Sequence, residues 1–150
     1  MDEKEKKYRE ISSLLEALFD AIPDIIGVQD ARHNIIRYNK AGYEFLHQTP
    51  ESVQGKKCFK LINRERQCDI CAISQTYETK KEAREEKYFP ELDLYLDTRS
   101  YPVLDENGEI EFVIEHLRDI TVQKKAELAL IDSKARFEAI LSALPDLMFI

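Results

Sequence analysis

The sequence contains no long apolar run and no apolar segment at its amino end. No stretch approaches the roughly 20 apolar residues of a membrane-spanning helix, so we expect no membrane contact by this segment. The first ten residues, MDEKEKKYRE, are charged where a secretory signal would be apolar. We therefore expect a cytoplasmic location, where cysteines stay reduced unless a site stabilises another state.

Basic charge and catalytic motifs are also lacking. The formal net charge of −7 and the pI of about 5.1 speak against a nucleic-acid partner, because phosphate binding needs a basic face. The sequence has no glycine-rich phosphate loop and no nucleophile elbow. Its acidic residues fall in solvated runs such as Glu82 to Lys87, so we expect no catalytic residue in this segment.

The sequence does contain enough apolar material for one domain, at 43% of its 150 residues. An apolar stripe at spacings of three and four residues predicts an amphipathic helix over residues 1–22, ended by Pro23. The same spacing is typical of helices that pair as coiled coils, so we expect a homodimer through the terminal helices. The stripe consists of Tyr8, Ile11, Leu15, Leu18 and Ile22.

The rest of the chain alternates between short strands and short helices. Strands are expected over residues 25–29, 35–38, 84–89, 92–103 and 109–117. Helices are expected over residues 40–46, with Asn39 as the cap, and over residues 58–62, 72–81 and 122–144. This order predicts an α+β fold, in which short helices cover one face of a five-stranded antiparallel sheet. A pocket between sheet and helices is expected to be lined by Ile26, Tyr43, Phe59, Ile62, Phe112 and Ile114.

The end of the sequence echoes its beginning. Residues 136–150 resemble residues 14–28, and the pair Pro23-Asp24 recurs as Pro145-Asp146 at a separation typical of tandem domains. Each copy predicts a helix that stops before the proline and a buried strand after it. We therefore expect residues 136–150 to be the start of a second domain.

Six short motifs stand along the chain in a distinctive order. They are Pro23-Asp24-Ile25-Ile26, Tyr38-Asn39-Lys40-Ala41, Gly55-Lys56-Lys57, Ser100-Tyr101-Pro102-Val103, Asp105-Glu106-Asn107-Gly108 and Arg118-Asp119-Ile120-Thr121. Over about residues 8–124 this series resembles a PAS domain. The resemblance implies a PAS core over residues 23–121 and a connecting helix over residues 122–144. It also implies a sensory or dimerisation module, whose parent is most like a bacterial or archaeal sensor histidine kinase and less like a diguanylate cyclase.

The same resemblance bears on cofactors. Cys58 stands near the reactive cysteine of the family's light-sensing flavin branch, but the arginine and glutamine that follow it there are absent, and residues 112–117 contain no glutamine. Haem-binding members use a histidine on the helix before the three-strand run, and residues 73–81 contain none. Flavin and haem are therefore disfavoured, and the cofactor is unknown. We expect His33 in solvent and His116 partly buried in a hydrogen bond.

Three cysteines form the pattern Cys58-x9-Cys68-x2-Cys71. The spacing lets these thiolates share a metal ion, although zinc and iron–sulfur sites want a fourth ligand. Alternatively, Cys68 and Cys71 form a reversible disulfide, since the nearby Arg64 and Arg66 favour thiolates. In a third interpretation the thiols have no role, and Cys58 packs in the core.

The main functional hypothesis is a sensory module. A ligand- or redox-dependent change in the pocket would alter the last strand, and Asp119-Ile120-Thr121 would pass it to the following helix. One alternative is a dimerisation scaffold without a small-molecule ligand. The other is a cysteine-based metal or thiol redox sensor.

Overall fold

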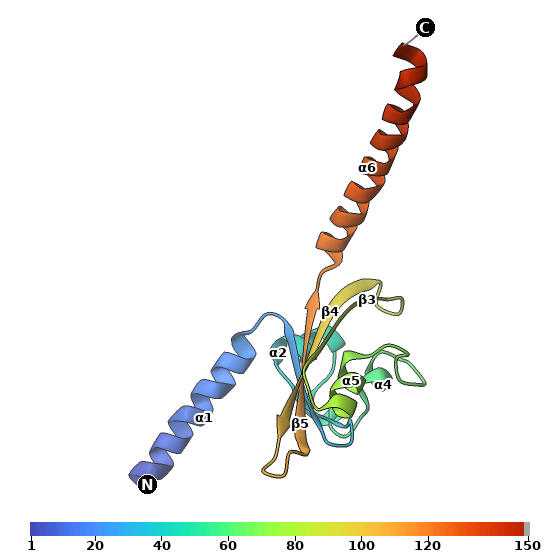
Figure 1. Ribbon diagram of the computed structural model, residues 1–150. Coiled ribbons are helices and arrows are strands. Elements are labelled where there is room, and N and C mark those ends of the chain that lie inside the picture. Colours follow the sequence, from blue (N-terminus) through green and yellow to red (C-terminus); the bar gives the residue numbers. More distant parts are fainter. Residues whose placement is uncertain (149–150) are drawn as a thin grey trace. The chain divides into compact units, whose positions relative to one another are not determined.

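The computed structural model describes the backbone of residues 1–148 and the side chains of residues 1–144. Five strands form one antiparallel sheet (Figure 1), and their order in it is β2-β1-β5-β4-β3. They are β1 Ile25–Asp30, β2 Ile35–Tyr38, β3 Ala83–Phe89, β4 Leu94–Leu104 and β5 Ile110–Asp119. The chain divides into two units, Met1–Asp119 and Ile120–Ile150, and the first contains the whole sheet.

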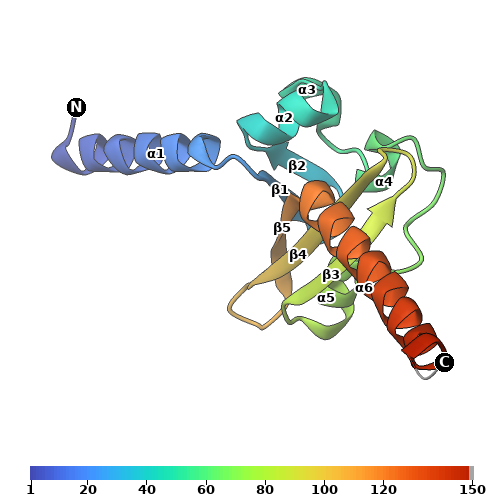
Figure 2. The ribbon, with the colours of Figure 1, turned by 90° about the horizontal axis from the view of Figure 1, so that it is seen from above.

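In the described part of the chain, six helices accompany the sheet. They are α1 Glu3–Ala21, α2 Lys40–Leu46, α3 Pro50–Val53, α4 Cys58–Leu61, α5 Ala72–Thr79 and α6 Thr121–Met148. In the first unit, α2 and α3 lie beside β2, which is an edge strand of the sheet (Figure 2). The predicted α+β class, the first helix and the long last helix are therefore confirmed. Within residues 1–148, no helix combines the length and the apolar character needed to cross a membrane.

Helix α6 differs from the prediction at its carboxyl end. The sequence predicted a helix that stops at Leu144, before Pro145, and then a strand, whereas α6 continues to Met148. A strand at this point needs a neighbouring strand to pair its backbone groups, and none of the described strands pairs with residues 145–148. A proline inside a helix removes one hydrogen bond but does not always end the helix. The end of the predicted strand, at residues 149–150, lies outside the described residues.

Asn39 joins three elements of the first unit. It is fully buried, and its side-chain oxygen accepts hydrogen bonds from the backbone N–H of Gly42 at 3.0 Å and of Ile26 at 3.0 Å. Its amide nitrogen donates to the carbonyl oxygens of Ile22 at 3.1 Å and Asp24 at 2.9 Å. Asn39 thus caps α2, as the sequence predicted, and also fixes the segment between α1 and β1.

Two aspartates shape the hairpin turns. Asp30 accepts hydrogen bonds from the backbone N–H of Arg32 at 2.8 Å and Asn34 at 3.0 Å in the β1–β2 turn. Asp105 accepts from the backbone N–H of Asn107 at 2.8 Å and Glu109 at 2.9 Å in the β4–β5 turn. Short acceptor side chains that satisfy nearby backbone groups are typical of turns.

One face of the sheet is covered by helices and forms the inner face. Helix α5 packs on β3, β4 and β5, and α2 packs on β1 and β2. Every second residue is buried along β1 and at Val113 and Glu115 in the middle of β5, because successive side chains of a strand point to opposite faces. The buried residues on this face include Ile25 and Gln29 of β1 and Val113 and Glu115 of β5. The inner face therefore carries both apolar and polar buried groups.

Candidate ligand cavity

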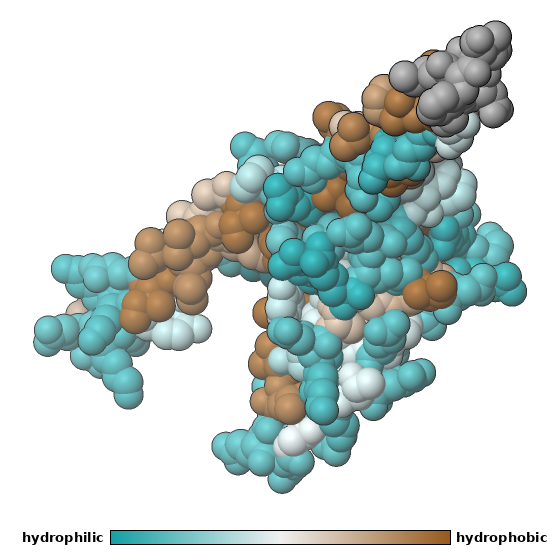
Figure 3. Space-filling model, turned by 45° about the horizontal axis from the view of Figure 1, so that its top comes forward, coloured by the Kyte–Doolittle hydropathy of each residue, from teal (hydrophilic) through white to brown (hydrophobic). Residues whose placement is uncertain are grey.

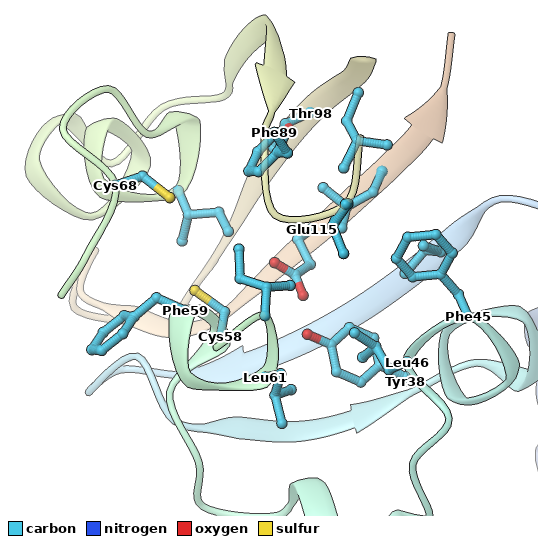
Figure 4. Close-up of a pocket in the computed structure, with 16 residues that line it drawn as sticks. Tyr38, Phe45, Leu46, Cys58, Phe59, Leu61, Cys68, Phe89, Thr98 and Glu115 are labelled. Atoms are coloured by element: carbon cyan, nitrogen blue, oxygen red, sulfur yellow. The ribbon is translucent and has the colours of Figure 1, made fainter. Parts of the chain in front are cut away.

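A cavity of about 80 Å³ lies between the inner face of the sheet and the helices (Figure 4). This is several times the space of roughly 10–15 Å³ that one water needs. Its walls come from side chains on the inner face of all five strands, from α2, α4 and α5, and from the connecting loops. The lining residues are Ile25, Tyr38, Phe45, Leu46, Cys58, Phe59, Leu61, Ile62, Cys68, Ile73, Phe89, Leu92, Leu96, Thr98, Glu115 and Leu117.

The lining only partly matches the set expected from the sequence. Phe59 and Ile62, on and just after α4, do line the cavity. Ile26, Phe112 and Ile114 do not, because they occupy the alternate positions of β1 and β5 and point to the other face of the sheet. The expectation for these three residues was wrong by one position along each strand.

Tyr43 also lies outside the cavity lining. It sits on α2, where its hydroxyl accepts a hydrogen bond from the backbone N–H of Tyr38 at 3.1 Å. Its ring meets the Tyr38 ring edge-on, with 6.1 Å between the centroids. Tyr43 therefore supports the wall formed by Tyr38 instead of facing the cavity.

Glu115 is the most unusual residue of the cavity. Its side chain is 1% exposed, and its Oε2 accepts a hydrogen bond from the Gln29 amide at 3.1 Å. Its Oε1 has no hydrogen-bond partner among the described residues. The Tyr38 hydroxyl points toward this carboxyl group (Figure 4). Burial in these surroundings raises the pKa of Glu115 above its ordinary value.

Gln29 connects Glu115 to a pair of stacked rings. The Tyr77 hydroxyl lies 3.5 Å from the Gln29 side-chain oxygen and donates to the backbone carbonyl of Asp30 at 2.5 Å. The Tyr77 ring stacks on His33 with 3.6 Å between the centroids. His33 is thus half-buried, not in solvent as predicted, and burial lowers its pKa. A ring that stacks flat on a turn residue is a tertiary contact that local sequence does not reveal.

The three cysteines lie near the cavity and are not disulfide-bonded. Cys58 begins α4 and lines the cavity, and burial raises the pKa of its thiol, so it packs as a neutral group. Cys68 also lines the cavity, and its sulfur accepts a hydrogen bond from the Arg64 guanidinium at 2.8 Å. Cys71 is the residue before α5. Among the described residues, no three histidine, cysteine or acidic side chains are placed to hold one metal ion.

The residues expected to transmit a signal stand where the two units meet along the chain. Asp119 is the last residue of β5 and is paired with Leu96 of β4. Ile120 lies between β5 and α6, and its carbonyl accepts a hydrogen bond from the Lys124 N–H at 2.8 Å. Thr121 begins α6. The strand that contributes Glu115 and Leu117 to the cavity is therefore the strand that leads into α6.

The stripe of α1 is exposed along its whole length. Helix α1 has no buried residue, and Figure 3 shows apolar side chains gathered along it. The exposed fractions run from 39% for Ile22 to 74% for Tyr8, and Ile11, Leu15 and Leu18 lie between. The contacts of α1 to the sheet lie off this stripe. Arg37 pairs with Glu16, with 2.6 Å between Nη1 and Oε1, and stacks on the Phe19 ring, and the Lys40 N–H donates to Asp20. The described residues of the first unit thus leave the apolar stripe uncovered.

On the outer face of the sheet, His116 contacts Asp24. His116 of β5 lies 2.8 Å from a carboxylate oxygen of Asp24, and its side chain is 26% exposed. This confirms the prediction of a partly buried, hydrogen-bonded histidine. The contact also ties the Pro-Asp segment before β1 to the last strand.

These features together define an α+β domain with an antiparallel sheet in the order 2-1-5-4-3, short helices over a cavity, and flanking helices. The family described as PAS fold matches residues 19–125, which is most of the chain. The chain therefore belongs to the PAS fold family. A comparison with curated protein sequences finds no match.

Several solved PAS domains share this fold. The PAS domain of Bordetella pertussis BvgS has a TM-score of 0.58 at 19% identity, over 85% of this chain and 98% of that one. The PAS domain of an HTR-like protein from Haloarcula marismortui has a TM-score of 0.54 at 22% identity, over 78% and 98%. The PAS domain of nitrogen regulation protein NR(II) from Vibrio parahaemolyticus has a TM-score of 0.57 at 14% identity, over 71% and 98%. At these identities the similarity establishes the fold.

Glu115 and Gln29 were missed by the sequence analysis, although a signal for Glu115 was present. Val113, Glu115 and Leu117 share one face of a strand, so the glutamate interrupts an apolar alternation. A charged residue at a core position is rare and calls for a partner. Attention to this one break in the pattern would have identified the polar group of the cavity.

Proposed function

We propose that this chain is a non-catalytic sensory PAS module, in which a small molecule enters the cavity and alters β5 and α6. The observation that carries the proposal is the position of Glu115 and Leu117, which line the cavity on the strand that continues into Asp119-Ile120-Thr121. A PAS fold with a cavity on its inner face is suited to binding a small ligand. In this proposal the output domain is a histidine kinase, as the resemblance to PAS domains of sensor kinases implies.

The mechanism requires two arrangements of β5 with similar free energies. Strand β5 is held on both sides, by β1 and by β4, so a shift of its cavity side chains changes the pairing near its end. A ligand that contacts Glu115 and Leu117 in only one arrangement stabilises that arrangement by its difference in affinity. The end of β5 then biases the first turn of α6. In this proposal residues 23–121 are the sensory core, residues 122–144 connect it onward, and residues 136–150 begin a second module.

Native mass spectrometry of freshly purified protein tests the ligand, because it reports bound mass and oligomeric state together. We expect a bound small molecule, or a melting temperature that rises when a compound library contains a ligand. Transmission is tested in a longer chain with its output domain, by Asp119→Ala and Thr121→Ala against Glu106→Ala in the exposed β4–β5 turn. An unchanged ligand response in the first two variants would remove the proposed hinge.

The exposed stripe of α1 supports a second function, dimerisation with another copy of this chain. The stripe residues repeat at coiled-coil spacing and are left uncovered by the described residues of the first unit; they are Tyr8, Ile11, Leu15, Leu18 and Ile22. We expect Leu15→Glu with Leu18→Glu to convert a dimer into a monomer in light-scattering measurements. Ser13→Glu, which adds a charge off the stripe, is the matched control and should leave the dimer intact. A monomeric wild-type protein would contradict this function.

The contact between Arg64 and Cys68 supports a third candidate, a thiol redox sensor. The Arg64 guanidinium donates to the Cys68 sulfur and is itself held by Glu91, at 2.6 and 2.9 Å. A cation beside a sulfur favours reactions of the thiolate. In this candidate, diamide oxidises Cys68 and Cys71 to a disulfide and changes the melting temperature, and Cys68→Ser abolishes the change. Wild-type protein with three free thiols after diamide treatment would remove it.

A further inference from the structure

The cavity contains a buried carboxyl group without a counter-charge. Glu115 is 1% exposed, and no lysine, arginine or histidine of residues 1–144 lines the cavity. Charged side chains are almost never fully buried unless they are paired, because an unpaired buried charge is costly. From this geometry we infer that the cavity selects small apolar ligands that carry one cationic ammonium group, with Glu115 as the counter-charge. The inference rests on the proposed sensory function of the same cavity.

The groups around Glu115 suit a carboxylate. The Gln29 amide donates to Oε2 at 3.1 Å, and the Tyr38 hydroxyl points toward the carboxyl group (Figure 4). Gln29 is itself fully buried, so its orientation is fixed by the surrounding packing. Oε1 has no hydrogen-bond partner in the described residues and lies against Gly27 of β1, while the Glu115 side chain lines the cavity. An ammonium N–H supplies the missing donor and the missing positive charge together.

The remainder of the lining restricts the ligand to one charge and a small apolar body. Apart from Glu115, the cavity is lined by apolar side chains, two cysteines, Tyr38 and Thr98. A carboxylate or phosphate ligand would bring a second negative charge next to Glu115, which disfavours binding. A cavity of about 80 Å³ accommodates a short alkyl chain or the end of a longer one. The ligand class is therefore a short-chain or lipophilic amine in its protonated form.

Binding of the cation exchanges it for a proton. Without a ligand, burial raises the pKa of Glu115, so its carboxyl group keeps its proton to a higher pH than an exposed glutamate does. When a protonated amine enters, Glu115 loses this proton to the solvent and forms an ion pair, so one proton is released for each amine bound. Affinity for the amine should therefore rise with pH until Glu115 is ionised without ligand or the amine itself loses its proton.

The other titratable groups that face Glu115 do not produce the same rise of amine affinity with pH. Tyr38 of β2, Cys58 of α4 and Tyr77 of α5 all have pKa values raised by burial, so they stay neutral through the range used. Cys68 lies in the loop before α5 and lines the same cavity. The variant Cys68→Ser removes its contribution directly. His33 reaches Glu115 only through Tyr77 and Gln29, and His33→Gln tests it in the same way.

The experiment compares n-butylamine, butan-1-ol and butyrate, and then the hexyl series, by NMR titration and calorimetry of the whole chain. We expect butylammonium to bind about tenfold or more tightly than butanol, and butyrate not to bind. Each further methylene should add about fourfold until the cavity is full. Calorimetry in phosphate and in HEPES, whose ionisation enthalpies differ, should show release of about one proton. Glu115→Gln should bind the amine about tenfold more weakly and release no proton, with butanol affinity unchanged.

Two control variants separate the charge of Glu115 from surface charge and from loss of folding. Glu111→Gln removes an exposed charge from the same strand and should behave like the wild type. Leu61→Phe fills the cavity without changing its charge and should abolish amine binding, which keeps the test decisive if Glu115→Gln does not fold. Equal binding of amine and alcohol, amine binding that survives Glu115→Gln, or shifts confined to the acidic surface would each overturn the inference while the proposed sensory function stands. No cavity shift with any probe, together with no bound mass in native mass spectrometry, would overturn both.

Discussion

Asp97 and Glu115 are carboxyl groups buried on opposite faces of one sheet, in very different surroundings. Asp97 of β4 is 4% exposed and Glu115 of β5 is 1% exposed. On the outer face, Asp97 accepts hydrogen bonds from Arg84 at 2.9 and 3.1 Å and from Arg99 at 3.3 Å. On the inner face, Glu115 has the neutral Gln29 as its hydrogen-bond donor. The two carboxyl groups are thus similarly buried, but Asp97 has two cations as hydrogen-bond donors and Glu115 has none among the described residues.

The two groups show that burial alone does not set the charge of a side chain. For Asp97, burial would raise the pKa, but the hydrogen bonds and charges of Arg84 and Arg99 outweigh it and lower the pKa. For Glu115, burial dominates and the pKa is raised. Asp97 is therefore a carboxylate already paired with cations of the protein, whereas Glu115 keeps its proton to a higher pH and would lose it when a cation enters.

The largest expected effect comes from crowding Glu115, through Gly27→Ala. A Cβ atom at Gly27 would lie 2.6 Å from Cε1 of Tyr38 and 2.8 Å from Cγ of Glu115, closer than side chains pack. Because both neighbours are buried, we expect a loss of about 1–3 kcal/mol in the free energy of unfolding. Urea denaturation measures it.

A double-mutant cycle separates Glu115 from Tyr38 in this effect. In a Glu115→Ala background the cost of Gly27→Ala should be smaller, since one of the two obstructing side chains is gone. An identical cost in both backgrounds would mean that Tyr38 alone obstructs the Cβ atom. Gly27→Ala would then say nothing about how tightly Glu115 is held.

The elements of the fold follow from local sequence, which is why they were predictable. Apolar spacing, Pro23 and the Asn-Gly turn each act within a few residues, and Asn39 was correctly expected to cap α2. The choice of face was not predictable in the same way. Ile25 and Ile26 on β1, and Val113 and Ile114 on β5, place apolar residues on both faces, so the pattern did not indicate which face would be covered.

The partners of the two carboxyl groups depend on contacts between distant segments. Gln29 and Glu115 come from β1 and β5, and their contact follows from the pairing of these strands. Asp97 and Arg84 meet because β3 and β4 are paired, with Glu86 opposite Asp97. Neither contact can be predicted from the sequence unless the pairing of the strands is known. The cavity residues Phe59 and Ile62 were found because they belong to a short helix expected over the inner face, which local pattern does indicate.

A smaller effect of the opposite sign is expected from Glu115→Gln without ligand. Between the ordinary glutamate pKa and the raised pKa of Glu115, the folded protein holds a proton that the unfolded chain has lost. Stability of the wild type therefore falls as pH rises through this range, and the glutamine variant avoids that loss. We expect the variant to be more stable by about 1–2 kcal/mol at pH 8. The gain should shrink toward pH 4, as measured by thermal unfolding across pH.

Glu111→Gln is the matched control for this pH dependence, because Glu111 is exposed on the same strand. It should leave the stability profile close to that of the wild type. A Glu115→Gln variant that is less stable at pH 8 than at pH 4, relative to the wild type, would show that Glu115 is ionised and already paired in the folded protein.

The smallest effect, again reversed in sign, is expected from Asp97→Asn. The folded-state pKa of Asp97 is lowered, so near that pKa the unfolded chain binds more protons, and the ion pairs stabilise the fold above the ordinary aspartate range. Because Arg84 and Arg99 are 54% and 39% exposed, solvent screens the pairs, and we expect a loss of under about 1 kcal/mol at pH 7. The loss should vanish as pH falls through the lowered pKa, while Glu106→Gln in the exposed turn shows neither effect. A loss that persists at low pH would mean that Asp97 contributes by its hydrogen bonds as a neutral group, and the contrast with Glu115 would then rest on packing instead of charge.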